Sequence, residues 1–148
     1  MLNGGAHGGS TGARAPARGP FGPFDVIVVH DPHIEGIIDL ASRFPDVRFL
    51  ANAGQRTPLE LAARAVGAAS GELVLLTEDH CIPRQDWVRT MAAAVAPGRA
   101  VIGERVEIGP TASATDWAFY FVDFFRYAAP VDGGPSPSLT VCNACYRR

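Results

Sequence analysis

The sequence predicts an α/β fold in which a mainly parallel sheet is flanked by helices. Short runs rich in Val, Ile and Leu, typical of strands covered on both faces, alternate with segments of helical periodicity. Those helical segments run for about ten to fifteen residues, as in βαβ units. The chain has 148 residues, 47% of them hydrophobic, which suffices for one globular domain with a single core.

The first strand follows a lead, residues 1–23, whose Gly-, Ala- and Arg-rich composition predicts a flexible segment. Residues 25–29 are a continuous, largely β-branched run and predict a buried strand. Residues 34–44 repeat apolar side chains at helical spacing until Pro45, and residues 47–50 predict a second strand. The domain is therefore expected to span residues 24–148.

A second helix has a clear start signal. Thr57 is expected as the N-cap, Pro58 as the first helical residue, and Glu60 as the residue that closes a capping box. The helix is expected to stop at Gly71, and residues 73–77 predict a third buried strand.

The remaining elements continue the alternation. A helix is expected to open at Pro83 and to end before Pro97, and residues 100–103 read as a strand. Near the C-terminus, a Pro-, Gly- and Ser-rich loop leads to a last apolar run at residues 139–141.

Residues 117–128 predict an aromatic helix capped by Thr115 and Asp116. This helix is apolar nearly all round. We favour a core helix, or a face left bare by missing segments. The alternative is contact with a lipid-linked acceptor or a membrane surface, because exposed aromatic patches mark interfaces.

Composition excludes several functions. A net charge of −2 with a pI near 6.0 gives no basic surface for nucleic acid. Cys81, Cys142 and Cys145 are an odd number in a chain without an export signal, which favours a reducing, cytoplasmic setting. No apolar run approaches the roughly 20 residues that span a bilayer, so we expect a cytoplasmic protein, with attachment to the membrane periphery as the alternative.

Two polar turns follow predicted strands. Asp31 follows the first strand, and Glu78, Asp79 and His80 follow the third. In parallel sheets, ligands bind beyond the carboxyl ends of the strands. A lone Asp there is as often a helix cap, but three consecutive polar groups could also ligate a hard divalent cation. We expect the two turns to converge on one pocket.

At this point the motifs become recognisable. Residues 25–31, then 71–83 with Trp87, resemble the family-2 glycosyltransferases of the GT-A fold. In that family, "A-x-G-E" leads to a strand, an acidic D-x-D-type motif, "I-P" and a Trp. Residues 143–148 are similar to the family's "N-x-A-x-R-R" segment, which lies beyond the sheet. The resemblance covers residues 24–148 and implies a GT-A-type, Rossmann-like fold that is incomplete.

The resemblance implies that the chain moves a sugar from a nucleoside-diphosphate donor to an acceptor, either lipid-linked or a glycan. Asp31 would contact the base or ribose. Arg64 would lie near the nucleotide, or else on a solvated helix face. Glu78 and His80 occupy the outer positions of the D-x-D motif with Asp79 between them. The implied ligands of Mg²⁺ or Mn²⁺ are thus Glu78, Asp79 and His80, and Asp79 could instead contact the ribose.

The sequence also departs from the family. The family's opening "P-x-Y-N" strand has no counterpart in the lead, and no carboxylate can be assigned as the catalytic base that inverting transfer needs. Asp116 and Asp123 are better read as a helix cap and a helix surface. We therefore expect a domain truncated at both ends, and the alternative function is a non-catalytic remnant that at most binds nucleotide.

A third possibility is a metal or thiol-redox protein. It would use His30, His33 and His80, or the C-x-x-C formed by Cys142 and Cys145. A lone C-x-x-C without a second pair is weak support for either chemistry.

Overall fold

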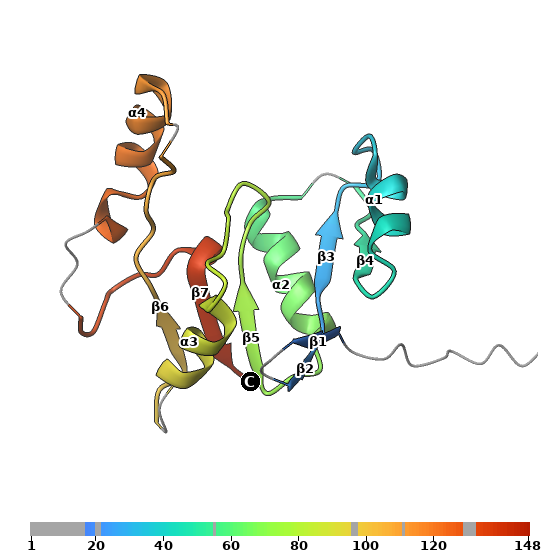
Figure 1. Ribbon diagram of the computed structural model, residues 1–148, viewed down its shortest axis with the longest axis horizontal. Helices are drawn as coiled ribbons and strands as arrows, with labels where there is room; N and C mark the ends of the chain where they lie inside the picture. The colour runs from blue at the N-terminus through green and yellow to red at the C-terminus, as the bar shows by residue number, and fades with distance from the viewer. Residues whose placement is uncertain (1–16, 20–21, 55, 96–97, 111, 129–132) are drawn as a thin grey trace, which may run out of the picture.

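The computed structural model describes residues 17–19, 22–54, 56–95, 98–110, 112–128 and 133–148. These parts of the chain form a mixed α/β fold (Figure 1), and the predicted α/β class is confirmed. Most of the predicted flexible lead lies outside the described residues. Two short strands pair antiparallel at the end of the lead, β1 (Ala17–Gly19) and β2 (Gly22–Phe24), where no strand was expected.

The N-terminal half, residues 24–72, contains a parallel pair of strands. β3 (Ile27–His30) pairs in register with β4 (Arg48–Ala51), and α1 (Ile37–Arg43) connects them. The helix begins three residues later than predicted because Gly36 has φ +77° and holds its N-cap position in the left-handed region. The side chains expected to form its apolar face are largely exposed, and Ile38 is 81% exposed.

The helix α2 (Pro58–Ala68) has the predicted start. The Thr57 hydroxyl accepts from the Glu60 amide, and the Glu60 carboxylate accepts from the Thr57 amide, so the predicted capping box is confirmed. The helix packs against β3. Its last turn is tied to β4, because Arg48 Nη1 donates to the Ala68 carbonyl at 3.2 Å.

The C-terminal half, residues 73–148, has a three-stranded sheet of order β5-β7-β6. Its strands are β5 (Leu73–Leu76), β6 (Val101–Gly103) and β7 (Ala144–Arg147). The same half contains the helix α3 (Trp87–Ala94) and the 3₁₀ turn η2 (Val141–Asn143). β7 runs antiparallel to both neighbours. In place of one mainly parallel sheet, the described strands thus form three small sheets: the antiparallel β1-β2 pair, the parallel β3-β4 pair and this antiparallel sheet.

The position of β7 corrects one expectation. The segment expected beyond the sheet supplies its central strand, Ala144–Arg147. The reason lies in packing: Ala144 and Cys145 are small and 0% exposed. Small side chains allow β7 to lie between β5 and β6 and under α3.

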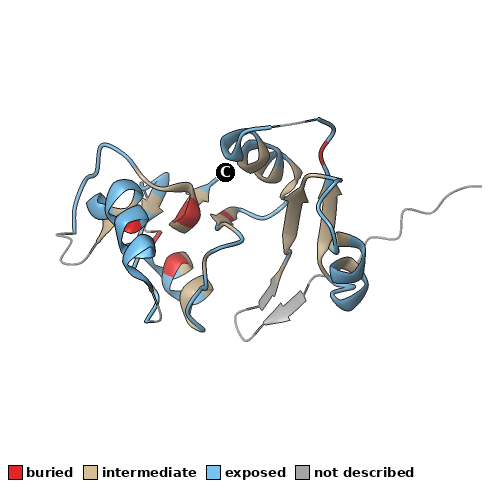
Figure 2. Ribbon diagram, turned by 90° about the horizontal axis from the view of Figure 1, so that it is seen from above, coloured by how far each residue is buried: buried red, intermediate tan, exposed pale blue. Residues whose placement is uncertain are grey.

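The buried apolar side chains lie in the C-terminal half (Figure 2). Among the described residues they are Val74, Met91, Val95, Tyr120, Cys142, Ala144 and Cys145. Met91, Val95 and Cys145 form one cluster that Leu75 and Trp87 help to cover. In the described part of residues 24–72, the one buried residue is Asn52, which is polar.

The aromatic helix α4 (Ala114–Asp123) continues into a 3₁₀ turn, η1 (Phe125–Tyr127). Its N-cap is Ser113, which shares a capping box with Asp116, so the helix begins three residues earlier than predicted. The expected core helix is not observed: Tyr120 is its one buried residue. Four aromatic side chains are exposed, namely Trp117, Phe119, Phe121 and Phe125. Within the described residues, no helix is long and apolar enough to cross a membrane.

Candidate functional site

An open hollow of about 490 Å³ lies where β3 and β4 end and α2 begins. It is lined by Asp31, Asn52, Gly54, Arg56, Thr57, Glu60 and Leu61. Six of these seven residues offer polar side chains or exposed backbone. The hollow is thus a polar site at the carboxyl ends of parallel strands, the position where α/β sheets bind ligands.

Asp31 forms the wall after β3. Its Oδ1 accepts from the backbone amide of His33 at 2.8 Å, which fixes the carboxylate in a tight turn. The alternative role as a helix cap does not apply, because Gly36 occupies the N-cap position of α1. Asp31 therefore stands at the hollow, as the strand-end rule predicted.

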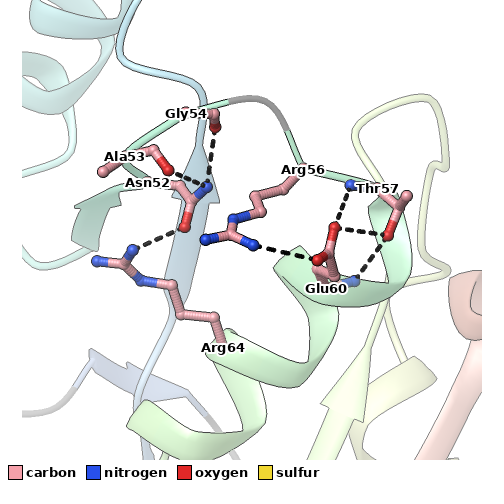
Figure 3. Close-up of polar contacts among 7 residues, drawn as sticks. All are labelled: Asn52, Ala53, Gly54, Arg56, Thr57, Glu60 and Arg64. Carbon is pink, nitrogen blue, oxygen red and sulfur yellow. Dashed lines mark hydrogen bonds and ion pairs between the residues drawn. The ribbon is translucent and has the colours of Figure 1, made fainter.

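The loop after β4 forms the floor and is organised by Asn52 (Figure 3). The Asn52 amide nitrogen of the backbone donates to the His30 carbonyl at 2.8 Å, which extends the strand pairing by one residue. The side-chain Nδ2 donates to the carbonyls of Ala53 and Gly54 at 3.4 and 3.1 Å. Arg64 Nη1 donates to Asn52 Oδ1 at 2.7 Å.

The opposite wall is the first turn of α2. Glu60 Oε2 accepts from the Thr57 amide at 2.8 Å, and Glu60 Oε1 pairs with Arg56 Nη1 at 3.2 Å. The hydrogen bond from the Thr57 backbone, followed by those from the Thr57 hydroxyl and Arg56, lowers the pKa of Glu60. Glu60 is thus a carboxylate at neutral pH, and the hollow holds two carboxylates and one guanidinium.

The second polar turn follows β5. His80 Nε2 lies 3.5 Å from Glu78 Oε2, and His80 Nδ1 lies 3.6 Å from Asp79 Oδ1. The two carboxylates thus face opposite nitrogens of one imidazole, and one ion cannot contact all three groups in this arrangement. In the chain segments described, no three His, Cys, Asp or Glu side chains gather closely enough to hold a metal ion.

The two turns do not share the hollow. Asp31 lines it, whereas Glu78, Asp79 and His80 do not. β3 and β5 run in the same direction, so their carboxyl ends face the same side of the molecule (Figure 1). Arg64 is brought to the loop of the hollow through Asn52 and does not line the hollow itself.

The second turn is largely exposed and has an aromatic neighbour. The ring of His80 lies 6.3 Å from that of Phe124, so the aromatic helix ends beside this turn.

Burial raises the pKa of the Cys142 thiol to about 11, and the neighbouring Cys81 and Glu78 add to this effect. Burial also raises the pKa of Cys145. Both cysteines of the C-x-x-C are therefore protonated core thiols, which weighs against redox or zinc chemistry.

The sequence model of one protein family, described as glycosyl transferase family 2, matches residues 14–148. The chain belongs to this family. No curated protein and no solved structure matches the sequence. Membership of glycosyl transferase family 2 assigns the chain to a glycosyltransferase-like function in general terms, and it agrees with the resemblance found in the sequence.

Part of the site of this family-2 domain could not be recognised from the sequence. Asn52 was not singled out, although Asn52-Ala53-Gly54 after a strand is a recognisable turn signal. Thr57 and Glu60 were recognised as a helix cap but not as a wall of the hollow. A cap beside the end of a parallel strand could have suggested that second role.

Proposed function

We propose that the chain transfers a sugar from a nucleoside-diphosphate donor to an acceptor and that the hollow beside Asp31 holds the nucleoside. The polar lining of the hollow at the carboxyl ends of β3 and β4 is the observation that supports this most. The carboxylates of Asp31 and Glu60 accept hydrogen bonds from ribose hydroxyls or base N–H groups. Two carboxylates against one guanidinium, that of Arg56, leave the hollow with a net negative charge, so we expect the diphosphate outside it.

The diphosphate is expected on the side of Glu78, Asp79 and His80. Carboxylate oxygen and imidazole nitrogen suit Mg²⁺ or Mn²⁺, and such ions take several ligands from water and phosphates rather than from a full protein cage. Glu78 with His80, which lie 3.5 Å apart, are the pair best arranged to share one ion. Asp79 stays a candidate for the metal or the ribose. When bound, such an ion neutralises the charge of the leaving diphosphate.

The acceptor is expected to reach this turn along α4. The contact between His80 and Phe124 supports that route, as do the exposed Trp117 and Phe121. Exposed apolar patches are typical interaction sites, and a lipid-linked acceptor or a glycan suits such a surface. The three cysteines are free thiols, which supports a reducing cytoplasmic setting.

Calorimetric titration tests this proposal. UDP, GDP, CDP and ADP are each added to the full chain, with and without Mn²⁺. We expect one of them to bind, more tightly with Mn²⁺, and Asp31→Ala to weaken binding in both conditions. Glu78→Ala should remove the effect of Mn²⁺ without abolishing nucleotide binding. Absence of binding by all four nucleotides would count decisively against the proposal.

A non-catalytic nucleotide-binding role is the second candidate. It is favoured by the small core, which leaves the described N-terminal half without a buried apolar side chain. Binding without hydrolysis or transfer, unchanged by Glu78→Ala or His80→Ala, would support this role over catalysis.

A further inference from the structure

Arg64 and Asn52 form a link between helix α2 and the loop that lines the hollow. Arg64 lies within α2, and its Nη1 donates to Asn52 Oδ1 at 2.7 Å. Asn52 is 6% exposed, and its Nδ2 donates to the carbonyls of Ala53 and Gly54. The amide oxygen and the amide nitrogen of Asn52 are thus both engaged by the protein itself.

The arrangement separates Arg64 from the ligand space. Asn52 and Gly54 line the hollow, whereas Arg64 does not. The guanidinium approaches Asn52 from the side of α2, and the Ala53 and Gly54 carbonyls lie at the other end of the amide (Figure 3). An influence of Arg64 on the shape of the hollow would therefore pass through Asn52.

The turn that Asn52 holds has a demanding backbone. Gly54 has φ +78°, which side-chain-bearing residues rarely adopt, and the flexibility of glycine makes such a turn costly to order. Hydrogen bonds from a charged donor are roughly twice as strong as neutral ones. The Arg64 contact therefore orients the Asn52 amide, and the amide fixes the carbonyls of Ala53 and Gly54.

We propose that Arg64 is a positioning residue for nucleotide binding: it holds Asn52, and Asn52 shapes the 52–54 turn of the hollow. This rests on the proposed function. It differs from the expectation drawn from the resemblance, in which Arg64 lies against the nucleotide. Direct contact and positioning give different results when Arg64 and Asn52 are changed together, because independent contacts with the ligand add, whereas a residue that acts wholly through another adds nothing once that other is removed.

The first experiment needs no ligand. Hydrogen exchange of the Ala53, Gly54 and Thr57 amides is followed by NMR in the full chain. We expect Arg64→Ala and Asn52→Ala each to speed exchange at the turn on the order of tenfold. Arg99→Ala is the control, because it removes the same charge from an exposed site preceding β6. Unchanged exchange in Arg64→Ala would overturn the proposal.

Two conservative variants separate the halves of the link. Arg64→Lys keeps a charged donor for Asn52 Oδ1 and should restore most of the protection. Asn52→Asp keeps an acceptor for Arg64 but has no N–H for the Ala53 and Gly54 carbonyls, so it should resemble Asn52→Ala. If circular dichroism shows that Arg64→Ala lowers the folded population, the test uses Arg64→Lys and Asn52→Asp instead. If the amides of the turn exchange as slowly in Asn52→Asp as in the wild type, the proposed link between Arg64, Asn52 and the turn is contradicted.

The second experiment measures UDP binding by calorimetry as a double-mutant cycle. We expect Arg64→Ala and Asn52→Ala each to weaken binding on the order of tenfold, and the double variant to bind no more weakly than either. Losses that multiply to about a hundredfold would mean independent contact by Arg64 and would overturn positioning. If wild type binds no UDP, the proposed function is at fault, and the exchange experiment still decides whether Arg64 orders the turn.

Discussion

The two halves of the described fold differ in what they bury. Residues 73–148 contain the buried apolar side chains, centred on Met91 and Cys145, whereas in residues 24–72 the buried residue described is the polar Asn52. The hollow lies in the N-terminal half, residues 24–72. The half with the polar site thus packs its strands and α2 with side chains that stay partly exposed, whereas the half with the core has fully buried apolar side chains. A bound ligand would therefore stabilise the N-terminal half more than the C-terminal half.

The largest expected effect is in the core. Met91 is 0% exposed, so Met91→Ala should leave a cavity and lower the free energy of unfolding by about 2–5 kcal/mol. Ile38→Ala is the matched change in the N-terminal half, where Ile38 is 81% exposed, and it should change stability by less than about 0.5 kcal/mol. Urea unfolding measures both. If both variants lose the same free energy of unfolding, the proposed difference between the two halves is contradicted.

Thiol reactivity tests how firmly the core of the C-terminal half is packed. The pKa of Cys142 is raised from 9.0 to about 11, so its thiolate is about 100-fold scarcer at pH 8 than that of an ordinary thiol. Cys142 and the fully buried Cys145 should resist iodoacetamide until the chain unfolds, whereas the partly exposed Cys81 should react in the native state. Peptide mass spectrometry reads the three sites. Native labelling of Cys142 as fast as Cys81 would show that this core opens readily.

At the hollow, the expected effect concerns binding rather than folding. Asp31→Asn keeps an oxygen that can accept from the His33 amide but removes the charge. We expect nucleotide binding to weaken on the order of tenfold, with unfolding unchanged, because hydrogen bonds to a charged group are the stronger ones. Asp46→Asn, at an exposed site of the same half outside the lining, should leave binding unchanged. A similar loss in both variants would point to a general charge effect.

The smallest effect concerns pH. The pKa of Glu60 is lowered from 4.5 by its hydrogen bonds with Thr57, so its contribution to stability is present above pH 4.5 and is lost as the pH falls through the lower folded-state value. Glu60→Gln should therefore flatten the fall in the thermal unfolding midpoint under acid conditions. Asp116→Asn should do the same for α4, because Ser113 lowers the pKa of Asp116 in the same way. An acid dependence that neither change alters would contradict these assignments.

Local signals explain which elements could be predicted. The capping box of Thr57 and Glu60 depends on residues three apart, and it was found from the sequence. The strand β7 could not be predicted because its pairing is distant: Leu73 lies opposite Arg147. No periodicity within residues 139–148 reveals which of them meets β5, because small side chains that suit a sheet centre also suit a loop.

The site shows the same division. Asp31 could be predicted from its place after a β-branched run. The roles of Asn52 and Arg64 depend on a contact between a loop and a helix residue twelve positions later, which becomes visible once α2 is folded against β3 and β4. The metal ligands Glu78, Asp79 and His80 and the nucleotide contact of Asp79 remain predictions.

The most direct measurement is a nucleotide titration of the isotope-labelled 15.7 kDa chain followed by amide NMR. Our account predicts that UDP, or whichever of the four diphosphates binds, first shifts the amides of Asp31, Gly54 and Thr57 around the hollow. With Mn²⁺, paramagnetic broadening should then spread from Glu78 and His80. Saturable binding that leaves the hollow amides unmoved, or that shifts residues of the C-terminal core alone, would contradict it.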